Sequence, residues 1–456
     1  MNDTRGADGN SQRIGRVAGV TAFTATTIAV ADMVGIGVFT SLGFQVQGIQ
    51  SAFSIILLWV VGGIVALCGA LSYSELAAAL PRSGGEYNFL SRIYHPGVGF
   101  MAGWLSATVG FAAPVALAAM AFGAYFKGVF PDGPSQLVLA LAISWAVGLV
   151  HLTGVRHGSL FHNVSTVLKV LLIAGFVVAG LAYGTPQEIS FTPRLEDLQH
   201  ITGAPFAIGL VFVMYSYSGW NASTYIMSEV REPQRTVPIS LFAATLIVLV
   251  LYVALNAVFL YTTPMDKMAG QVEVALVAGT HIFGEQGGRI VGALICFGLI
   301  STISAMTWIG PRVTKVMGED LPALAIFAKE TRHGVPAVAI LLQLAIVTVL
   351  IFTQSFESVL DYIQFSLTLS SFLAVLGVIV LRFRQPALPR PYRSWGYPLT
   401  PLVFMAVTGF MMFYLITDRP LQSLAGLATL FAGLVVYALS TRMKAAKPSE
   451  GVSIGE

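Results

Sequence analysis

The sequence predicts an all-α integral membrane protein with twelve transmembrane helices. Only 10% of its 456 residues are charged, against about 25% in a typical soluble protein. Residues of the set AVILMFWYC make up 55% of the chain, which is more than the interior of a globular protein of this length could bury. These residues also gather into twelve long apolar segments, as a chain that crosses a membrane repeatedly requires.

The segments are identified by length, because a helix needs about 20 apolar residues to cross the hydrocarbon core. The least clear is the fourth, which is short and contains His151. The expected spans are 17–44, 53–80, 98–127, 136–153, 160–183, 203–228, 237–262, 287–316, 335–354, 357–382, 399–417 and 421–441. They divide the chain into an N-terminal tail (1–16), a first set of five helices (17–183), a second set of five (203–382), a final pair (399–441) and a C-terminal tail (442–456).

The basic residues predict the orientation. Nineteen of the 25 lysines and arginines fall on the side of the two termini, five fall on the other side, and Lys169 lies within a span. Cytoplasmic loops carry an excess of Lys and Arg, so we expect both termini in the cytoplasm. A missed or additional helix would remove this asymmetry, which therefore supports the even number of spans.

Composition and spacing exclude several other classes of protein. The net charge is only +3 and is spread along the chain, so nothing indicates nucleic-acid binding. Cys68 and Cys296 lie in apolar runs and the seven histidines lack ligand spacing, so we expect neither a disulfide scaffold nor a metal site. We expect no cofactor and no enzyme, because no nucleophile, base or metal constellation is present. The polar start lacks a cleavage site and is interpreted as a tail, not a signal peptide.

Two of the spans contain residues that an ordinary helix avoids. The first reads Val34-Gly35-Ile36-Gly37-Val38-Phe39 in its middle, and the sixth reads Tyr215-Ser216-Tyr217-Ser218-Gly219-Trp220-Asn221. Each glycine costs about 1 kcal/mol against alanine in a helix, and serines offer competing hydrogen bonds. The alternative is that these small residues let helices pack closely, as they do in many membrane proteins.

The positions of the two interruptions favour a binding site. They fall in the first span of each set of five helices, which are equivalent places if the two sets are repeats of opposite orientation. Unwound backbone is tolerated in a membrane only where protein covers it or where it lines a cavity. Free amides from Gly35 to Val38 would attract a carboxylate, and free carbonyls from Tyr215 to Ser218 would attract a cation. Such a site suits a zwitterion.

Five motifs then occur in an order that points to one family. They are Val34–Phe39; Tyr73-Ser74-Glu75-Leu76 with Pro81-Arg82-Ser83-Gly84-Gly85-Glu86-Tyr87; Ser218-Gly219-Trp220-Asn221; Ser228-Glu229-Val230 with Pro233–Pro238; and Arg390-Pro391-Tyr392 with Trp395-Gly396-Tyr397-Pro398. Across nearly its whole length the chain resembles an amino acid permease of the amino acid–polyamine–organocation (APC) superfamily. The motifs are most similar to those of the L-type and cationic amino acid transporter-like bacterial branch.

The resemblance implies a LeuT-like fold, with a 5+5 inverted repeat, discontinuous helices 1 and 6, and two additional C-terminal helices. It implies that the amides of Ile36, Gly37 and Val38 bind a substrate carboxylate. The carbonyls of Tyr215, Ser216 and Ser218 would then receive the substrate amino group. Tyr215 occupies the place of the family's aromatic gate; the alternative is a packing or interfacial tyrosine.

Lys169 is a candidate functional residue because a lysine deep in a membrane span costs about 3 kcal/mol or more. The alternative is that its flexible stem reaches the membrane surface. The resemblance places this lysine where sodium sits in ion-coupled relatives. Its ammonium group would then replace sodium and could exchange a proton.

Asp32 departs from the apolar or small residue that the family usually has just before the first break. We predict that Asp32 and Lys169 approach each other beside this break, since opposite charges reduce the cost of burying each other. The pair would move a proton or hold an inner gate. The alternative is an aspartate satisfied by neighbouring hydroxyls or water.

The expected function is import of small or medium neutral L-amino acids, coupled to protons and independent of sodium. The rival is obligatory amino acid exchange, and a channel or nutrient sensor on the same scaffold is a distant alternative. We expect contact with membrane lipid. The resemblance implies that a disulfide-linked heavy-chain partner would need a cysteine between the third and fourth helices, as in animal members of the L-type branch; the loop 127–133 contains none, so we expect no such partner. A prokaryotic plasma membrane is the expected location.

Overall fold

The structure is a computed structural model that describes residues 20–153, 158–332, 334–353 and 355–446. The N-terminal tail predicted at 1–16 lies outside these ranges. The last ten residues of the predicted C-terminal tail, 447–456, also lie outside them.

Regular structure in the described ranges is helical, apart from one β-bridge between Val20 and Val230. The helices of the first half are α1 (Ala22–Met33), α2 (Gly37–Gly48), α3 (Ala52–Ala79), α4 (Glu86–Ile93), α5 (Pro96–Leu105), the π-helical turn η1 (Ser106–Gly110), α6 (Ala112–Val129), α7 (Gln136–Leu152) and α8 (Gly158–Tyr183). Those of the second half are α9 (Asp197–Ile201), α10 (Ala204–Ser216), the 3₁₀ helix η2 (Ala222–Glu229), α11 (Pro233–Thr262), α12 (Met265–Met268), α13 (Val274–Asp320), the 3₁₀ helix η3 (Pro322–Ala328), α14 (Ala337–Phe352), α15 (Phe356–Arg384), α16 (Leu399–Asp418) and α17 (Pro420–Ala446).

The apolar segments found in the sequence correspond to helices. In the described part of the chain, nine helices are long and apolar enough to cross a membrane, and α7, α10 and α14 are shorter apolar helices. The span expected at 287–316 begins earlier, because α13 runs from Val274 and bends at Gly284, whose φ is 73°. The protein is therefore a multi-pass membrane protein, and the count of twelve crossings stays a prediction.

Capping residues explain several of the helix starts. The side chains of Thr21, Ser51, Ser135 and Ser355 accept hydrogen bonds from backbone amides in the first turns of α1, α3, α7 and α15. Each of these bonds satisfies an amide that has no acceptor within its own helix. Proline occupies the first turn of α5, α10 and α11, where its missing N–H removes no helical hydrogen bond.

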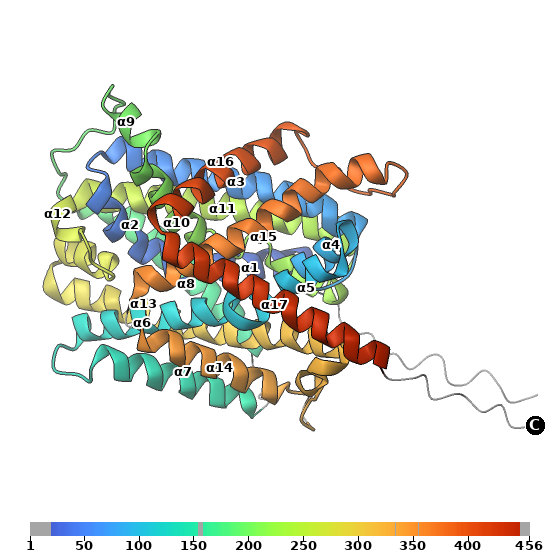
Figure 1. Cartoon of the computed structure of the whole chain (residues 1–456). Coiled ribbons are helices and arrows are strands. Elements are labelled where there is room, and N and C mark those ends of the chain that lie inside the picture. Colours follow the sequence, from blue (N-terminus) through green and yellow to red (C-terminus); the bar gives the residue numbers. More distant parts are fainter. Residues whose placement is uncertain (1–19, 154–157, 333, 354, 447–456) are drawn as a thin grey trace, which may run out of the picture.

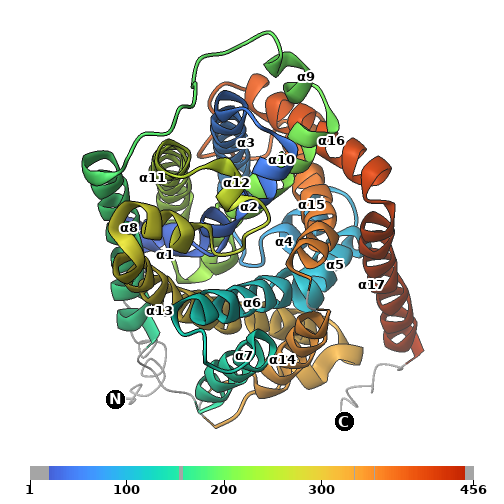
Figure 2. The ribbon, with the colours of Figure 1, turned by 90° about the vertical axis from the view of Figure 1, so that its left-hand side faces the viewer.

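The interrupted helices lie at the centre of the bundle. Figure 1 shows the long helices running in the same general direction, and the end-on view of Figure 2 shows α1, α2 and α10 surrounded by α3, α11, α13, α6 and α15. The helices α7, α14 and α17 lie at the outside (Figure 2). Large exposed side chains on α17, such as Leu421 and Phe431, are consistent with a surface that faces lipid.

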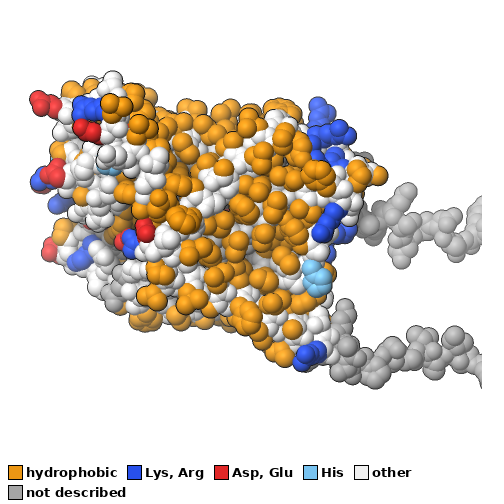
Figure 3. Space-filling view, turned by 45° about the horizontal axis from the view of Figure 1, so that its top comes forward, with side chains coloured by type: hydrophobic (Ala, Val, Ile, Leu, Met, Phe, Trp, Pro, Cys, Tyr) orange, Lys and Arg blue, Asp and Glu red, His pale blue; other side chains and the backbone are white. Residues whose placement is uncertain are grey.

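Charged side chains gather at the two ends of the molecule, with an apolar belt between them (Figure 3). One end is predominantly blue in this view, and we call it the basic end. Helices α3 and α15 finish at this end (Figure 1), and at these helix ends or in the loops that follow lie Arg82, Arg382, Arg384, Arg390 and Arg393. The opposite end has both red and blue side chains (Figure 3). The belt agrees with a protein embedded in a bilayer, and the unequal charge agrees with the sequence-based orientation.

Candidate functional site

The first span is interrupted at the predicted place. Helix α1 ends at Met33 and α2 begins at Gly37, with Val34–Ile36 between them. The amides of Gly37 and Val38 have no acceptor within α2, because they lie in its first turn. Glycine is required at position 37, since a Cβ there would lie 2.5 Å from Ser216 Oγ.

The sixth span is also interrupted. Helix α10 ends at Ser216, a turn covers Tyr217–Asn221, and the chain continues as the 3₁₀ helix η2. Gly219 has a φ of 102°, which favours glycine, and a Cβ on it would lie 2.8 Å from the carbonyl carbon of Asp32. The two breaks therefore press directly against each other.

Tyr252, on α11, connects both breaks. Its hydroxyl oxygen lies 2.6 Å from the carbonyl oxygen of Met33 and 3.1 Å from that of Ser216. Both carbonyls belong to helix ends, where no amide of the same helix is available as the usual donor. The single hydroxyl proton of Tyr252 is therefore shared between two buried acceptors. The ring is fully buried and packs edge-on against Trp59 at 5.6 Å. Tyr252 thus holds the two interrupted helices together.

A cavity of about 100 Å³ lies beside the two breaks. A single water molecule needs roughly 10–15 Å³ of such cavity volume, so the cavity has room for several waters. It lies on the basic-end side of the breaks, because Asp32 precedes the first break and Ser218–Asn221 lead from the second towards Val230. Its other lining residues include Glu86, Phe111, Tyr225 and Phe404, and Ser106 and Gly110 of the π-helical turn η1. Such π-helical turns occur frequently at functional sites.

The residues predicted for substrate binding and proton coupling do not all line this cavity. Asp32 and Ser218 line the cavity, whereas Gly35, Ile36, Gly37, Val38, Tyr215 and Ser216 are not among its lining residues. The Ser216 hydroxyl lies 3.0 Å from the Ser41 hydroxyl and donates to the carbonyl of Phe212 at 2.8 Å, so it joins α10 to α2. Tyr215 is buried, and its role as a gate stays a prediction.

The two charged residues in the spans have different surroundings. Lys169 is only 6% exposed, and its ammonium donates to the hydroxyl of Thr302 at 2.8 Å. Thr302 also lies beside Gly35, because its Cγ2 would be 3.6 Å from a Cβ at that position. Asp32 has a buried Oδ1 atom without a hydrogen-bond partner in the described part of the chain.

Asp32 and Lys169 are near enough to interact electrostatically, but they do not form an ion pair. Among the ion pairs within 4.0 Å in the described ranges, none joins these two side chains. The hydroxyl of Thr302 takes the place next to the ammonium that the carboxylate was expected to fill. This hydroxyl donates in turn to the Gly298 carbonyl at 3.3 Å, so it can accept from Lys169 while its own proton is used.

Glu86 binds the inner half of the sixth span. Its Oε1 accepts hydrogen bonds from the hydroxyl of Tyr73 and from Asn221 Nδ2, both at 2.8 Å, and its Oε2 accepts one from the hydroxyl of Tyr225. Asn221 and Tyr225 belong to the chain after the second break, whereas Tyr73 lies on α3. A carboxylate that is 6% exposed is thus stabilised by three donors, as a buried charge requires.

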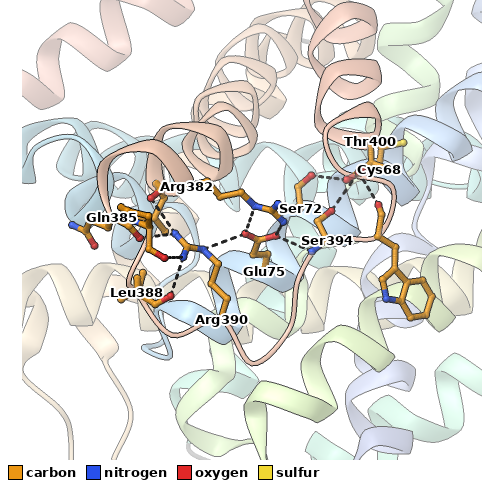
Figure 4. A network of polar contacts seen from close by, with 12 residues as sticks. Cys68, Ser72, Glu75, Arg382, Gln385, Leu388, Arg390, Ser394 and Thr400 are labelled. Carbon is orange, nitrogen blue, oxygen red and sulfur yellow. Dashed lines mark hydrogen bonds and ion pairs between the residues drawn. The ribbon is translucent and has the colours of Figure 1, made fainter.

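A second buried carboxylate, Glu75, lies at the end of α3 (Figure 4). Arg382 of α15 donates to its two oxygens at 2.9 and 2.6 Å, and the amide of Ser394 donates at 2.8 Å. Arg390 Nε lies 3.5 Å from Glu75 Oε1, while its terminal nitrogens donate to backbone carbonyls, including those of Gln385 and Leu388. These contacts attach the loop 385–398 and α15 to α3 (Figure 4).

The opposite end of α2 is tightly packed. Phe44 stacks on Phe212 at 5.1 Å and on Phe356 at 5.7 Å between ring centroids. The amide of Gly270 donates to the carbonyl of Gly43 at 2.8 Å, so the segment after α12 lies directly on α2. The structure therefore combines a packed junction towards the end opposite the basic one with a cavity on the basic-end side.

Comparison with known proteins decides the family. A model of the amino acid permease family matches residues 20–439, which is nearly the whole chain. The chain belongs to the amino acid permease family. Proteins of this family are transporters, so the permease is a multi-pass membrane transporter of the APC superfamily and not an enzyme.

Individual relatives come from animals and bacteria. The permease is 27% identical to the b(0,+)-type amino acid transporter 1 of Mus musculus over 90% of this chain and 85% of that protein. It is 26% identical to the serine/threonine exchanger SteT of Bacillus subtilis, over 91% of this chain and 94% of the relative. It is also 25% identical to the large neutral amino acids transporter small subunit 2 of Mus musculus, over 91% of this chain and 80% of that protein. Since relatives come from both kinds of organism, a prokaryotic origin of the permease stays a prediction.

Sequence reasoning missed two residues that organise this part of the permease. Tyr252 was not singled out, although a tyrosine far inside an apolar span needs a partner for its hydroxyl, and this need was the available signal. Glu86 appeared in the sequence analysis only as part of a motif, whereas the structure places it on the cavity wall. Its partners are 13, 135 and 139 positions away in the sequence, so no local pattern indicated them.

Proposed function

We propose that the permease imports neutral L-amino acids across the plasma membrane by alternating access, coupled to protons and independent of sodium. The main support is the meeting of two interrupted helices at the centre of the bundle, next to a cavity. In secondary transporters, such discontinuous helices form substrate sites at the midplane of the bilayer.

Residues 17–183 and 203–382 would form the two inverted repeats of a LeuT-like fold, followed by a C-terminal pair of helices at 399–441. The breaks support this division because each falls in the first span of its set. Both termini would be cytoplasmic, which agrees with the concentration of arginine at the basic end (Figure 3).

The substrate would bind with its carboxylate at the amides of Gly35, Ile36, Gly37 and Val38, at the positive end of α2. Its amino group would bind the carbonyls of Tyr215, Ser216 and Ser218, with Tyr215 as the gate. The Ser216 carbonyl keeps a second lone pair beside the one that faces Tyr252, so it can still accept from an ammonium group.

The neutrality of the substrate side chain follows from the two carboxylates on the cavity wall. Glu86 already accepts three hydrogen bonds, and Asp32 is assigned to proton coupling. If Asp32 carries the coupled proton, neither carboxylate would pair with a positively charged substrate side chain. The cavity wall also includes Phe111, Met214 and Met306, which suit an apolar or small group.

Proton coupling would involve Asp32 and Lys169. The Asp32 carboxylate has an unpartnered buried oxygen next to the cavity, which is a high-energy position for a charge and favours proton uptake. The Lys169 ammonium, next to Thr302 and the first break, would occupy the place of a sodium ion. Sodium would then have no role in the cycle.

Exchange is the second candidate function, because one relative is named a serine/threonine exchanger. Uptake of labelled L-alanine, L-serine and L-leucine into sodium-free proteoliposomes distinguishes proton symport from exchange. Accumulation in empty vesicles under an inward proton gradient is the result expected of symport. Uptake only into preloaded vesicles would identify an exchanger and contradict proton coupling.

The variant Asp32→Asn tests the coupling residue in the same assay. We expect proton-driven accumulation to be lost, because an amide cannot carry the proton, and the dependence of uptake on external pH to flatten. Glu86→Gln is the control for a second carboxylate on the same wall. Full transport by Asp32→Asn with an unchanged pH profile would refute the assignment.

The permease would work without a disulfide-linked partner chain. Its two cysteines, Cys68 and Cys296, are both free and buried, so neither is available at the surface for such a bond. Non-reducing electrophoresis of the protein from its native membrane is the test, and a shift to a larger species on omission of reductant would overturn the proposal.

A further inference from the structure

A second and larger cavity lies on the surface at the basic end. Its volume is about 930 Å³, and three separate segments form its walls. They are Pro81 after α3, Glu232–Ala243 at the start of α11, and Pro391–Trp395 in the loop between α15 and α16. Nothing in the proposed transport cycle uses this cavity.

One wall of the cavity is apolar and aromatic. Trp395 is 62% exposed, and its ring lies 5.7 Å from that of Phe242 and 6.3 Å from that of Tyr392. Ile239 is 51% exposed on the same stretch of α11. Exposed tryptophan and tyrosine are typical of the membrane–water boundary, where one end of the ring is apolar and the other is hydrated.

The apolar wall continues along α11 towards the middle of the apolar belt. Positions 239, 243, 246 and 250 follow the three- and four-residue spacing of one helix face. Leu246 is 41% exposed and Val250 58% exposed, so this face does not pack against the rest of the described chain. A hydrocarbon chain that starts in the cavity therefore has a continuous apolar path into the bilayer.

The other wall carries positive charge. Arg235 lines the cavity, Arg231 precedes the lining residue Glu232, and Arg393 follows the lining residue Tyr392; all three arginines are exposed. The lining itself contains one basic and one acidic residue, Arg235 and Glu232, and the positive charge beside the cavity comes from Arg231 and Arg393, which are its neighbours in the sequence. The positive end of the 30-residue helix α11 adds to the attraction for an anion.

We propose that this cavity binds one anionic phospholipid of the cytoplasmic leaflet. Its phosphate head lies at Arg231, Arg235 and Arg393, and one acyl chain follows Ile239 and Ala243 along α11. A soluble phosphate would use the charged wall alone and leave the apolar wall uncovered. The combination of a charged wall, an aromatic boundary and an apolar path requires an amphipathic ligand, and a basic cluster at a membrane surface selects an anionic one.

The test is native mass spectrometry of the full-length protein in detergent, with phosphatidylglycerol or phosphatidylcholine of the same acyl chains. We expect one phosphatidylglycerol to be retained in preference to phosphatidylcholine. The double variant Arg231→Gln/Arg235→Gln should weaken phosphatidylglycerol binding by about fivefold per arginine. Arg289→Gln, an exposed arginine at the opposite end, is the matched control and should leave binding unchanged.

A second variant tests the apolar wall independently of charge. Ala243→Trp fills the path along α11 and should reduce retention of phosphatidylglycerol while every arginine remains, so it decides the question even if the double variant folds poorly. Glycerol phosphate, the soluble head group, should not displace the lipid. Equal retention of the two lipids would overturn the proposal. So would equal loss in Arg289→Gln and the double variant, or displacement by glycerol phosphate.

Discussion

Single polar atoms decide how the centre of this permease is held together. The Tyr252 hydroxyl faces two carbonyls at helix ends: that of Met33, which also accepts from the amide of Gly35, and that of Ser216, which has no backbone donor in the described ranges. The Lys169 ammonium is satisfied by Thr302, whereas one oxygen of Asp32 has no partner in the described ranges. The junction of the two breaks thus contains one satisfied charge and one unsatisfied one, and this difference supports the proposal that Asp32 is the proton-coupling residue.

Replacing Tyr252 by phenylalanine tests the shared proton. We expect Tyr252→Phe to reduce thermal stability in detergent by about 1–3 kcal/mol, because the buried Ser216 carbonyl loses its donor and the Met33 carbonyl keeps only that of the Gly35 amide. Transport should fall as well, since the relative position of the two breaks is no longer fixed. Measurement of thermal stability and of transport in the same preparation of the variant checks the prediction.

Tyr217→Phe is the matched control for this substitution. Tyr217 is equally buried, lies 5.1 Å from Tyr252 between ring centroids, and donates to a single carbonyl, that of Trp59, at 3.2 Å. Loss of the Tyr217 hydroxyl should reduce transport less than loss of the Tyr252 hydroxyl. Equal effects of the two variants would show that ring packing, and not the shared hydroxyl, maintains the junction.

Asp197 gives the opposite end of the molecule a dependence on pH. Hydrogen bonds from Ser51, from the amide of Arg194 and from Ser54 hold the pKa of this carboxyl below its usual value. A depressed pKa means that the carboxylate form stabilises the fold above the unfolded pKa of about 3.9, and that this contribution disappears as the pH falls through the folded pKa.

The variant Asp197→Asn should therefore unfold at a lower temperature than the parent protein at pH 7, by roughly 2 kcal/mol of stability. The difference should begin to shrink below a pH of about 4, where the carboxyl group of the unfolded chain takes up a proton, and should disappear once the pH falls below the lowered pKa of the folded state. Thermal unfolding of both proteins between pH 3 and 8 measures this. A difference that is independent of pH would contradict the assignment.

At the scale of the elements, local sequence predicted the interruptions but not their partners. Gly35, Gly37 and Gly219 signal the breaks because glycine and serine destabilise a helix wherever they occur. The contact of Tyr252 with Met33 spans 219 positions, and that of Lys169 with Thr302 spans 133. Asp32 and Lys169 interact electrostatically without forming an ion pair, and a hydroxyl from such a distant segment accepts the hydrogen bond of the ammonium instead.

A substitution of Gly219 tests whether transport requires the close contact between the two breaks. Gly219→Ala introduces both a strained positive φ, which costs about 1–3 kcal/mol, and a clash with the backbone of Asp32. We expect loss of transport together with reduced stability. Gly284→Ala is the matched control, because Gly284 has a φ of 73° and no atom within 4 Å of an added Cβ. Similar losses in both variants would assign the effect to backbone strain alone.

At the scale of the whole molecule, polar networks at the basic end connect segments that are remote in the chain. Glu75 joins α3 to α15 and to the loop 385–398, and Glu86 joins α3 to the segment after the second break. In the sequence both residues belong to one motif, which follows the second predicted span. It could not assign their partners, because residues from 13 to 319 positions away supply the donors.

The Glu75 network is the stronger of two salt-bridge sites at this end. In the pair of Glu75 and Arg382 the side chains are 2% and 23% exposed, whereas in the pair of Arg82 and Asp320 they are 51% and 32% exposed. Removing one partner of a buried pair costs about 3–5 kcal/mol, because the remaining charge is left uncompensated. Exposed pairs contribute about 0–1 kcal/mol, because water and salt screen them.

We therefore expect Glu75→Gln to destabilise the permease by about 3 kcal/mol, and Arg82→Gln by less than about 1 kcal/mol. The loop 385–398 should also become sensitive to protease in Glu75→Gln, because Arg382, Arg390 and the Ser394 amide lose the carboxylate that positions them. Thermal unfolding and limited proteolysis of the two variants measure these effects. If the loop were cut equally in both, surface charge would explain the change, and the buried carboxylate would have no role in joining α15 to α3.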